Sequence, residues 1–198
     1  MDTQVVFSIE SYVRAGFYSP SQILAIICDE AYASDQLNPQ VVMQIIEEKM
    51  EIKLLDEKKW ARFTHNDLLD RFYRNLNKSG IIALQNVKDY SNGLDEVTDI
   101  YQDQKYKNLT FRGFCFYQWQ DTEFAISGGG LRLSFGDVNG DKEMSLKIGH
   151  FICNGLQKSL PKAEWDGNLE KKIYIRNFKW RRRIQKEEEN RVVVNTKN

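Results

Sequence analysis

The chain has 198 residues and carries 28 basic and 28 acidic side chains, so its formal net charge is zero. A balanced charge argues against a dedicated nucleic-acid-binding protein, which needs a broad basic surface. With 41% hydrophobic and 12% aromatic residues, the chain can bury a core, and this excludes wholesale disorder.

Composition also bears on the compartment and on membranes. Cys28, Cys115 and Cys153 are odd in number and far apart, which is not the pattern of a disulfide framework. The N-terminus lacks the basic and apolar regions of a signal peptide, and no apolar run approaches the ~20 residues of a membrane helix. We therefore expect a soluble, cytoplasmic protein.

Helices are predicted along the first 62 residues. Apolar residues recur at helical spacing between residues 4 and 17. Ser19-Pro20 and Asn38-Pro39 each combine an N-cap residue with a proline at the first helical position, so a second and a third helix begin there. The solvent-facing side of the third helix is expected to carry Glu47, Glu48, Lys49, Glu51 and Lys53.

Further along, helices alternate with apolar runs that are typical of strands. Thr64, with Asp67 three positions on, begins a helix that ends at Ser79-Gly80. Later helices are expected at about Leu94–Gln104 and Met144–Leu160, with Phe151 on the buried side of the latter. The expected strands are Ile81–Val87, Phe114–Trp119, Leu131–Phe135, Ala163–Asp166 and Lys171–Ile175.

This order predicts an α+β fold in three parts. Residues 1–62 form a helical N-terminal unit. Residues 63–184 form a mixed sheet of four or five strands, with helices packed mainly on one face. Residues 185–198 form a charged, flexible tail.

Three consecutive glycines, Gly128, Gly129 and Gly130, precede the strand at Leu131. Successive glycines can expose backbone N–H groups to a phosphate. Phosphate-binding loops, however, follow a strand and open a helix, and the Gly-Lys-Ser/Thr sequence is missing here. We therefore interpret the glycines as a tight helix-to-strand turn with a left-handed backbone.

Asp121 and Glu123 lie between the aromatic strand and the glycine turn. Paired carboxylates can act as general acid and base or hold a metal. Acidic residues at a helix N-terminus are also ordinary capping partners. Capping is the simpler interpretation, and both remain open.

Other site patterns are weaker. The segment Asp137–Asp141 has its glycine at the wrong position for a calcium loop, and the glutamate expected at the twelfth position is missing. His65 and His150 are not near a cysteine at metal-binding spacing. We therefore expect no metal and no cofactor.

The run Trp180-Arg181-Arg182-Arg183 is the most basic stretch before the tail. Arginines can contact phosphates while a tryptophan stacks on a base. In a neutral protein, three arginines beside an acidic run are more often paired or solvated. An acidic protein partner would also use them.

Several of these motifs together resemble an uncharacterised bacterial family of domains of unknown function. The shared segments are NKSGIIALQN, the aromatic strand with QDTE, GGGL, WDG and WRRR, and they extend over residues 20–184. The resemblance implies that their residues meet at one edge of the sheet. They form either a site or a structural signature, with Asp166 paired with an arginine and the tryptophans in the core. This candidate edge consists of Gln120, Asp121, Glu123, Gly129, Gly130, Trp165, Asp166, Trp180, Arg181, Arg182 and Arg183.

The function that these observations favour is stoichiometric association with another protein, most concretely as an immunity or antitoxin protein that inhibits a toxin or effector. The sequence contains no recognisable catalytic set and many aromatic residues that suit interfaces. Nucleic acid and membranes are not expected partners. The alternative is an enzyme or small-ligand binder that uses Asp121, Glu123, Asp166 and Arg181–Arg183.

Overall fold

The computed structural model describes residues 2–31, 37–105 and 110–184. The predicted flexible tail, residues 185–198, lies outside these ranges. The chain divides into two compact units, a helical unit and a sheet unit. The helical unit contains the residues up to Arg62 and the segment that starts at Arg181, and the sheet unit is Phe63–Trp180. Residues 181–184, predicted as the end of the sheet unit, thus group with the helical unit instead.

The helical unit is built from elements whose starts are specified by local capping. The Asp2 side chain caps the first helix, Ser19 forms a capping box with Gln22, and Asn38 accepts hydrogen bonds from the N–H groups of Gln40 and Val41. These caps confirm the predicted helix starts at Pro20 and Pro39. Its described elements are α1 (Thr3–Ala15), α2 (Pro20–Ala25), the π-helix η1 (Ile26–Ala31) and α3 (Pro39–Glu57).

Lys53 on α3 does not face solvent as predicted. Its side chain is buried, and its ammonium donates hydrogen bonds to the carbonyl oxygens of Val13, at 2.9 Å, and Arg14, at 3.4 Å. These carbonyls lie in the last turn of α1, where helix geometry leaves them without intrahelical donors. Lys53 therefore joins α3 to the C-terminus of α1, and its burial lowers its pKa to about 8.

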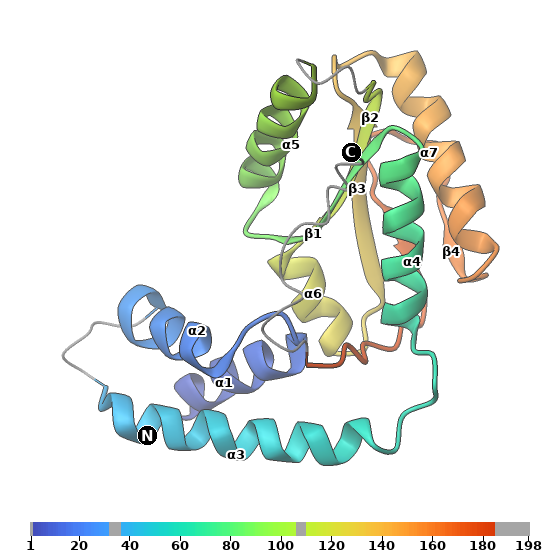
Figure 1. Ribbon diagram of the computed structural model, residues 1–198. Helices are drawn as coiled ribbons and strands as arrows, with labels where there is room; N and C mark the ends of the chain where they lie inside the picture. The colour runs from blue at the N-terminus through green and yellow to red at the C-terminus, as the bar shows by residue number, and fades with distance from the viewer. Residues whose placement is uncertain (1, 32–36, 106–109, 185–198) are drawn as a thin grey trace, which may run out of the picture. The chain divides into compact units, whose positions relative to one another are not determined.

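The sheet unit contains five strands in the order β1-β2-β3-β5-β4 (Figure 1). β1 and β2 are parallel, and each of the other pairs is antiparallel, so the sheet is mixed as predicted. Its elements are α4 (His65–Lys78), β1 (Ile81–Val87), α5 (Tyr90–Lys105), β2 (Gly113–Gln118), α6 (Trp119–Ile126), β3 (Leu131–Asp137), α7 (Lys142–Gln157), β4 (Ala163–Glu164) and β5 (Ile173–Ile175).

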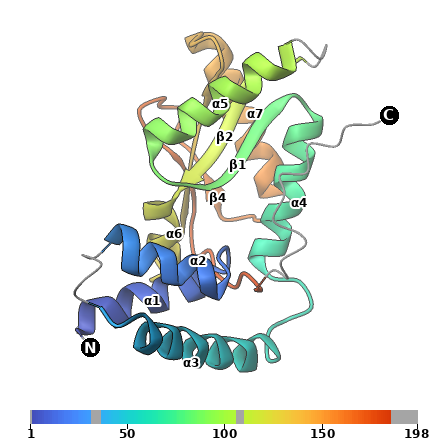
Figure 2. The same cartoon turned by 60° about the vertical axis from the view of Figure 1, so that its left-hand side comes forward.

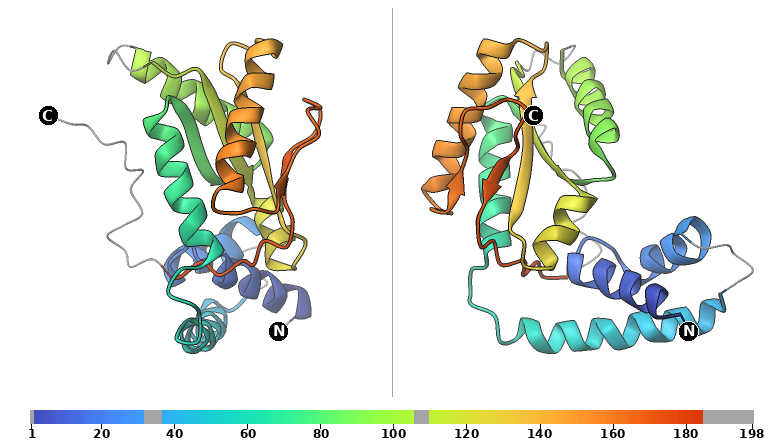
Figure 3. Two further views of the ribbon diagram at one scale, coloured as in Figure 1. Left: turned by 90° about the vertical axis from the view of Figure 1, so that its right-hand side faces the viewer. Right: turned by 180° about the vertical axis from the view of Figure 1, so that it is seen from behind.

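Helices cover both faces of this sheet. Figures 1 and 3 show α5 and α6 on one face and α4 and α7 on the other, and Figure 2 shows α5 lying across β1 and β2. The prediction that the helices pack mainly on one face was therefore wrong. The physical reason is that β2 is buried on both faces along its length, so each face needs its own cover.

Some element ends differ from the predictions for local reasons. α5 begins at Tyr90 rather than near Leu94, because the Asp89 side chain accepts the N–H of Asn92 and starts the helix early. Trp119 belongs to α6 rather than to the preceding strand. Phe151, expected on the buried side of α7, is 53% exposed.

The burial of Lys53 predicts how stability depends on pH. Because the folded state lowers its pKa to about 8, the unfolded chain binds more protons than the folded chain between pH 8 and 10.5. The free energy of unfolding should therefore rise with pH across this window. Between pH 7.5 and 9.5, the free energy of unfolding of the wild type, measured in urea, should rise by about 2 kcal/mol more than that of Lys53→Met.

The exposed neighbour Lys58 provides the control, because Lys58→Met should keep the wild-type pH profile. A wild-type profile that coincides with that of Lys53→Met would show that Lys53 is not desolvated in solution.

Candidate functional site

The carboxyl ends of the parallel strands β1 and β2 meet at one edge of the sheet. At this edge the register of β1 shifts between Leu84 and Val87, and Asn86 has a left-handed backbone with φ of 56°. Such a conformation is uncommon for a residue other than glycine. The buried Thr122 of α6 donates its hydroxyl hydrogen to Asn86 Oδ1 at 2.8 Å, which ties α6 to the end of β1.

Asp121 lies in the first turn of α6, immediately after β2. Its Oδ2 accepts the backbone N–H of Gln118 at 3.2 Å, so it takes part in capping α6 as one interpretation predicted. The same oxygen forms an ion pair with Lys172 Nζ at 2.6 Å. The Asp121 side chain is only 5% exposed and that of Lys172 is 30% exposed. Asp121 is therefore a buried, charge-paired carboxylate as well as a cap.

Ser134 on β3 lies next to this ion pair by sheet register. Ser134 pairs with Phe116 on β2. On its other side β3 pairs with β5, where Leu133 is opposite Ile173. The next position along this antiparallel pair brings Ser134 opposite Lys172. Residues directly opposite in an antiparallel pair point to the same face. Because Phe116 packs in the core cluster under α5, Ser134 and Lys172 also lie on the α5 and α6 face.

Two buried side-chain oxygen atoms in this region have no hydrogen-bond partner within the described part of the chain. They are Ser134 Oγ and Gln118 Oε1. Buried polar groups in folded proteins are nearly always hydrogen-bonded, so an exception asks for an explanation. We call Gln118, Asp121, Ser134 and Lys172 the polar cluster.

The glycine turn beside α6 is confirmed as a helix-to-strand turn. Gly128 and Gly130 have positive φ angles of 88° and 83°, and a side chain on Gly129 would overlap the Phe124 ring. Tyr174 donates its hydroxyl hydrogen to the Gly129 carbonyl at 2.7 Å. The glycines thus meet the steric needs of the turn.

The other predicted residues of α6 are less enclosed than Asp121. Gln120 is exposed, and its Oε1 accepts a long hydrogen bond of 3.4 Å from Gln118 Nε2. Glu123 is partly buried, and this burial raises its pKa, while a hydrogen bond with Trp119 acts in the opposite direction.

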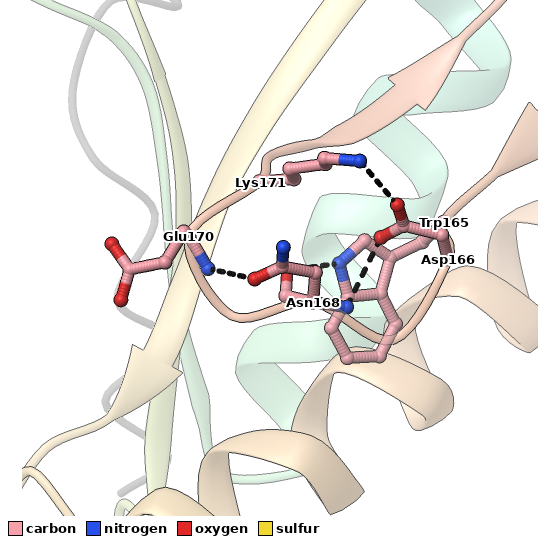
Figure 4. A network of polar contacts seen from close by, with 5 residues as sticks. All are labelled: Trp165, Asp166, Asn168, Glu170 and Lys171. Carbon is pink, nitrogen blue, oxygen red and sulfur yellow. Dashed lines mark hydrogen bonds and ion pairs between the residues drawn. The ribbon is translucent and has the colours of Figure 1, made fainter.

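Trp165 and Asp166 belong to an exposed loop with its own polar network (Figure 4). Asp166 forms an ion pair with Lys171 at 2.6 Å and accepts the N–H of Asn168 at 3.0 Å. These bonds lower the pKa of Asp166. The expected pairing of Asp166 with an arginine was therefore wrong. The indole of Trp165 donates to the Asn168 carbonyl and packs edge-on against Phe135 with ring centroids 5.0 Å apart.

Trp180 is the last residue of the sheet unit and lies among aromatic side chains. Its ring is 6.0 Å from the rings of both Tyr117 and Phe178. Tyr117 also donates its hydroxyl hydrogen to Gln85 Oε1 at 2.8 Å. Trp180 is therefore packed against aromatic side chains of the sheet unit and is partly buried.

Two of the arginines that follow Trp180, Arg182 and Arg183, contact other residues of the helical unit. Arg182 is buried, with its guanidinium 4.1 Å above the Phe17 ring, and Arg183 donates a hydrogen bond to the Ala61 carbonyl at 2.9 Å. The N–H of Ile184 donates to Glu57 Oε1 at 2.9 Å. We call residues 181–184 the C-terminal strap. Its buried Arg182 is not placed to contact a nucleic-acid backbone.

Within residues 2–31, 37–105 and 110–184, no group of three potential metal ligands comes together, and none of the helices is long and apolar enough to cross a bilayer. The described part of the chain thus has an α+β fold with a mixed five-stranded sheet.

The comparison with known families agrees with the resemblance seen in the sequence motifs. A family described as a domain of unknown function (DUF6891) matches residues 1–184, and the chain belongs to this family. The match begins earlier than the expected residue 20, so the family's domain includes α1. No curated protein and no solved structure matches the chain.

Three members of the polar cluster, Gln118, Ser134 and Lys172, were not among the predicted site residues. A signal for two of them is present in the sequence. In Leu131–Phe135, Arg132 and Ser134 alternate with apolar residues, which puts Ser134 on the face opposite to Leu133 and Phe135. In Lys171–Ile175, the alternation of Ile173 and Ile175 with polar residues puts Lys172 on the opposite face. The pairing of Lys172 with Asp121, 51 positions away, carries no sequence signal.

The two adjacent lysines predict a contrast in stability. Lys172→Met removes the partner of a buried carboxylate and should lower the free energy of unfolding by about 2–3 kcal/mol, because the charge of Asp121 is left uncompensated. Lys171→Met breaks an equally short pair with Asp166 that is exposed on both sides, so it should leave the free energy of unfolding nearly unchanged. Urea unfolding at pH 7 measures both, and equal losses would contradict this difference in burial.

Proposed function

We propose that this protein acts in the cytoplasm by stoichiometric association with another protein, most concretely as an immunity or antitoxin protein that occludes a toxin. The observation that carries the proposal is the solvent-facing side of α3. There, Ile52, Leu54 and Leu55 are 48%, 47% and 56% exposed, opposite the buried stripe that packs against the rest of the helical unit.

The helical spacing of these residues favours a protein partner. Ile52 and Leu55 are three positions apart, so they are neighbours on the helix surface. Glu48 and Glu51, both exposed, precede them by one turn each. An aliphatic pair bordered by acids suits a partner with an apolar groove and a basic rim, in the manner of a helix bound in a groove. A toxin that acts on nucleic acid would present such a basic rim, because it must bind phosphates.

The alternative function, an enzyme or ligand site made by Asp121, Glu123, Asp166 and Arg181–Arg183, has less support. Asp121 pairs with Lys172, whereas Asp166 pairs with Lys171 in a separate loop. Arg182 and Arg183 contact Phe17 and Ala61 of the helical unit. The proposal of a binding protein does not depend on these groups.

The α3 surface predicts which substitutions abolish association. We expect the tagged wild-type chain to retain one protein at near-stoichiometric amounts from its own cells. The double variant Ile52→Ser/Leu55→Ser should lose it while its free energy of unfolding changes by less than about 1 kcal/mol, because both side chains are already exposed. Affinity purification with mass spectrometry and a binding titration against the purified partner measure this.

Phe151→Ser is the matched control, since Phe151 is similarly exposed but lies on α7. It should retain the partner. Expression of the captured partner alone should arrest growth if it is a toxin, and co-expression of the wild type should restore growth. The proposal fails if no partner is retained, or if the double variant retains it as well as the control does.

A further inference from the structure

A second binding activity follows from the polar cluster of the sheet unit, independently of any protein partner. We propose that Ser134 and Lys172 bind a small molecule bearing an oxyanion group, a carboxylate or a phosphate, and that Asp121 holds Lys172 in place for this purpose. The argument rests on unmet hydrogen bonding, local charge and access from solvent.

Ser134 supplies the unmet hydrogen bonding. It is 5% exposed, and its Oγ has no partner among the described residues, although a hydroxyl can both donate and accept. An unpaired buried hydroxyl destabilises a fold relative to alanine at the same place. By sheet register Ser134 lies beside Lys172 on the same face of the sheet.

The charges on this face favour an anion. Arg132 and Ser134 are two positions apart on β3, so their side chains lie on the same face of the sheet. This is the face that α6 covers, because the Arg132 guanidinium lies 4.0 Å from the centre of the Phe124 ring of α6. With Lys172, this face carries two cationic side chains, and that of Lys172 is paired with Asp121. A cationic ligand would be repelled by Lys172. An oxyanion can accept hydrogen bonds from the remaining Lys172 N–H groups and from Ser134.

The cluster is accessible through Lys172. The side chain of this lysine is 30% exposed, whereas that of Asp121 is 5% exposed. The Lys172 side chain is therefore partly open to solvent while its ammonium contacts the buried carboxylate. Asp121 is itself fixed by the N–H of Gln118, so the position of the ammonium is set before a ligand arrives.

The test uses the full chain with two probes, inorganic phosphate and succinate, each compared with sodium chloride at the same ionic strength. Thermal unfolding and ¹⁵N chemical shifts of residues 118–122, 134 and 172 report binding. We expect one probe at ten times its Kd to raise the Tm by roughly 3–6 °C and to shift these resonances saturably. A response to phosphate would identify phosphate-bearing ligands, and a response to succinate would identify carboxylates.

The adjacent lysines again give matched variants. Lys172→Met should abolish the response, whereas Lys171→Met should retain it, since Lys171 pairs with Asp166 away from the cluster. If neither probe binds the wild type, or if both lysine variants respond alike, the proposal is wrong.

Ser134→Ala provides a second test that does not depend on the folding of Lys172→Met. It should raise the Tm of the ligand-free protein, because an unpaired buried hydroxyl is removed, and should weaken probe binding about tenfold through loss of one hydrogen bond to a charged group. A lower Tm with unchanged probe binding would show that the hydroxyl only holds a structural water, and this would overturn the assignment.

Discussion

The burial of β2 on both faces is the constraint on which the sheet unit depends. Its alternate side chains point to opposite faces, so Phe114 and Phe116 pack beneath α5, whereas Cys115 lies toward Tyr73 of α4, with Sγ and the tyrosine oxygen 3.7 Å apart. A strand of this kind cannot sit at an edge or face water on one side. The neighbouring strands and the helices of both layers are therefore placed around it, and α6 follows it directly to form the edge that contains Asp121.

Much of the architecture could be predicted because its determinants are local. The cap at Ser19, the cap at Asn38 and the Thr64–Asp67 box each involve residues within four positions of one another, and all three helices start where expected. The distribution of the helices over two faces was missed, although the continuous apolar run of β2 contains the information. A half-exposed strand would have shown alternation instead.

The candidate site was predictable only in part, for the opposite reason. Asp121 could be singled out because it follows a strand and begins a helix. Its partner Lys172 could not, since that pairing depends on how β3 and β5 come together. Lys53 shows the same limit. Its place in the helical pattern suggested a solvated lysine, but its contact with the end of α1, 40 positions earlier, reverses that assignment.

The C-terminal strap follows the sheet unit in the sequence but belongs to the helical unit. A motif that reads as continuous, WRRR, is divided, with Trp180 packed among the aromatics of one unit and Arg182 buried in the other. The sheet unit is in effect an insertion within the helical unit. During synthesis, all residues of the sheet unit leave the ribosome before the strap does, so the sheet can form first. The helical unit, although it is encoded first, can be completed only after the sheet unit has been synthesised.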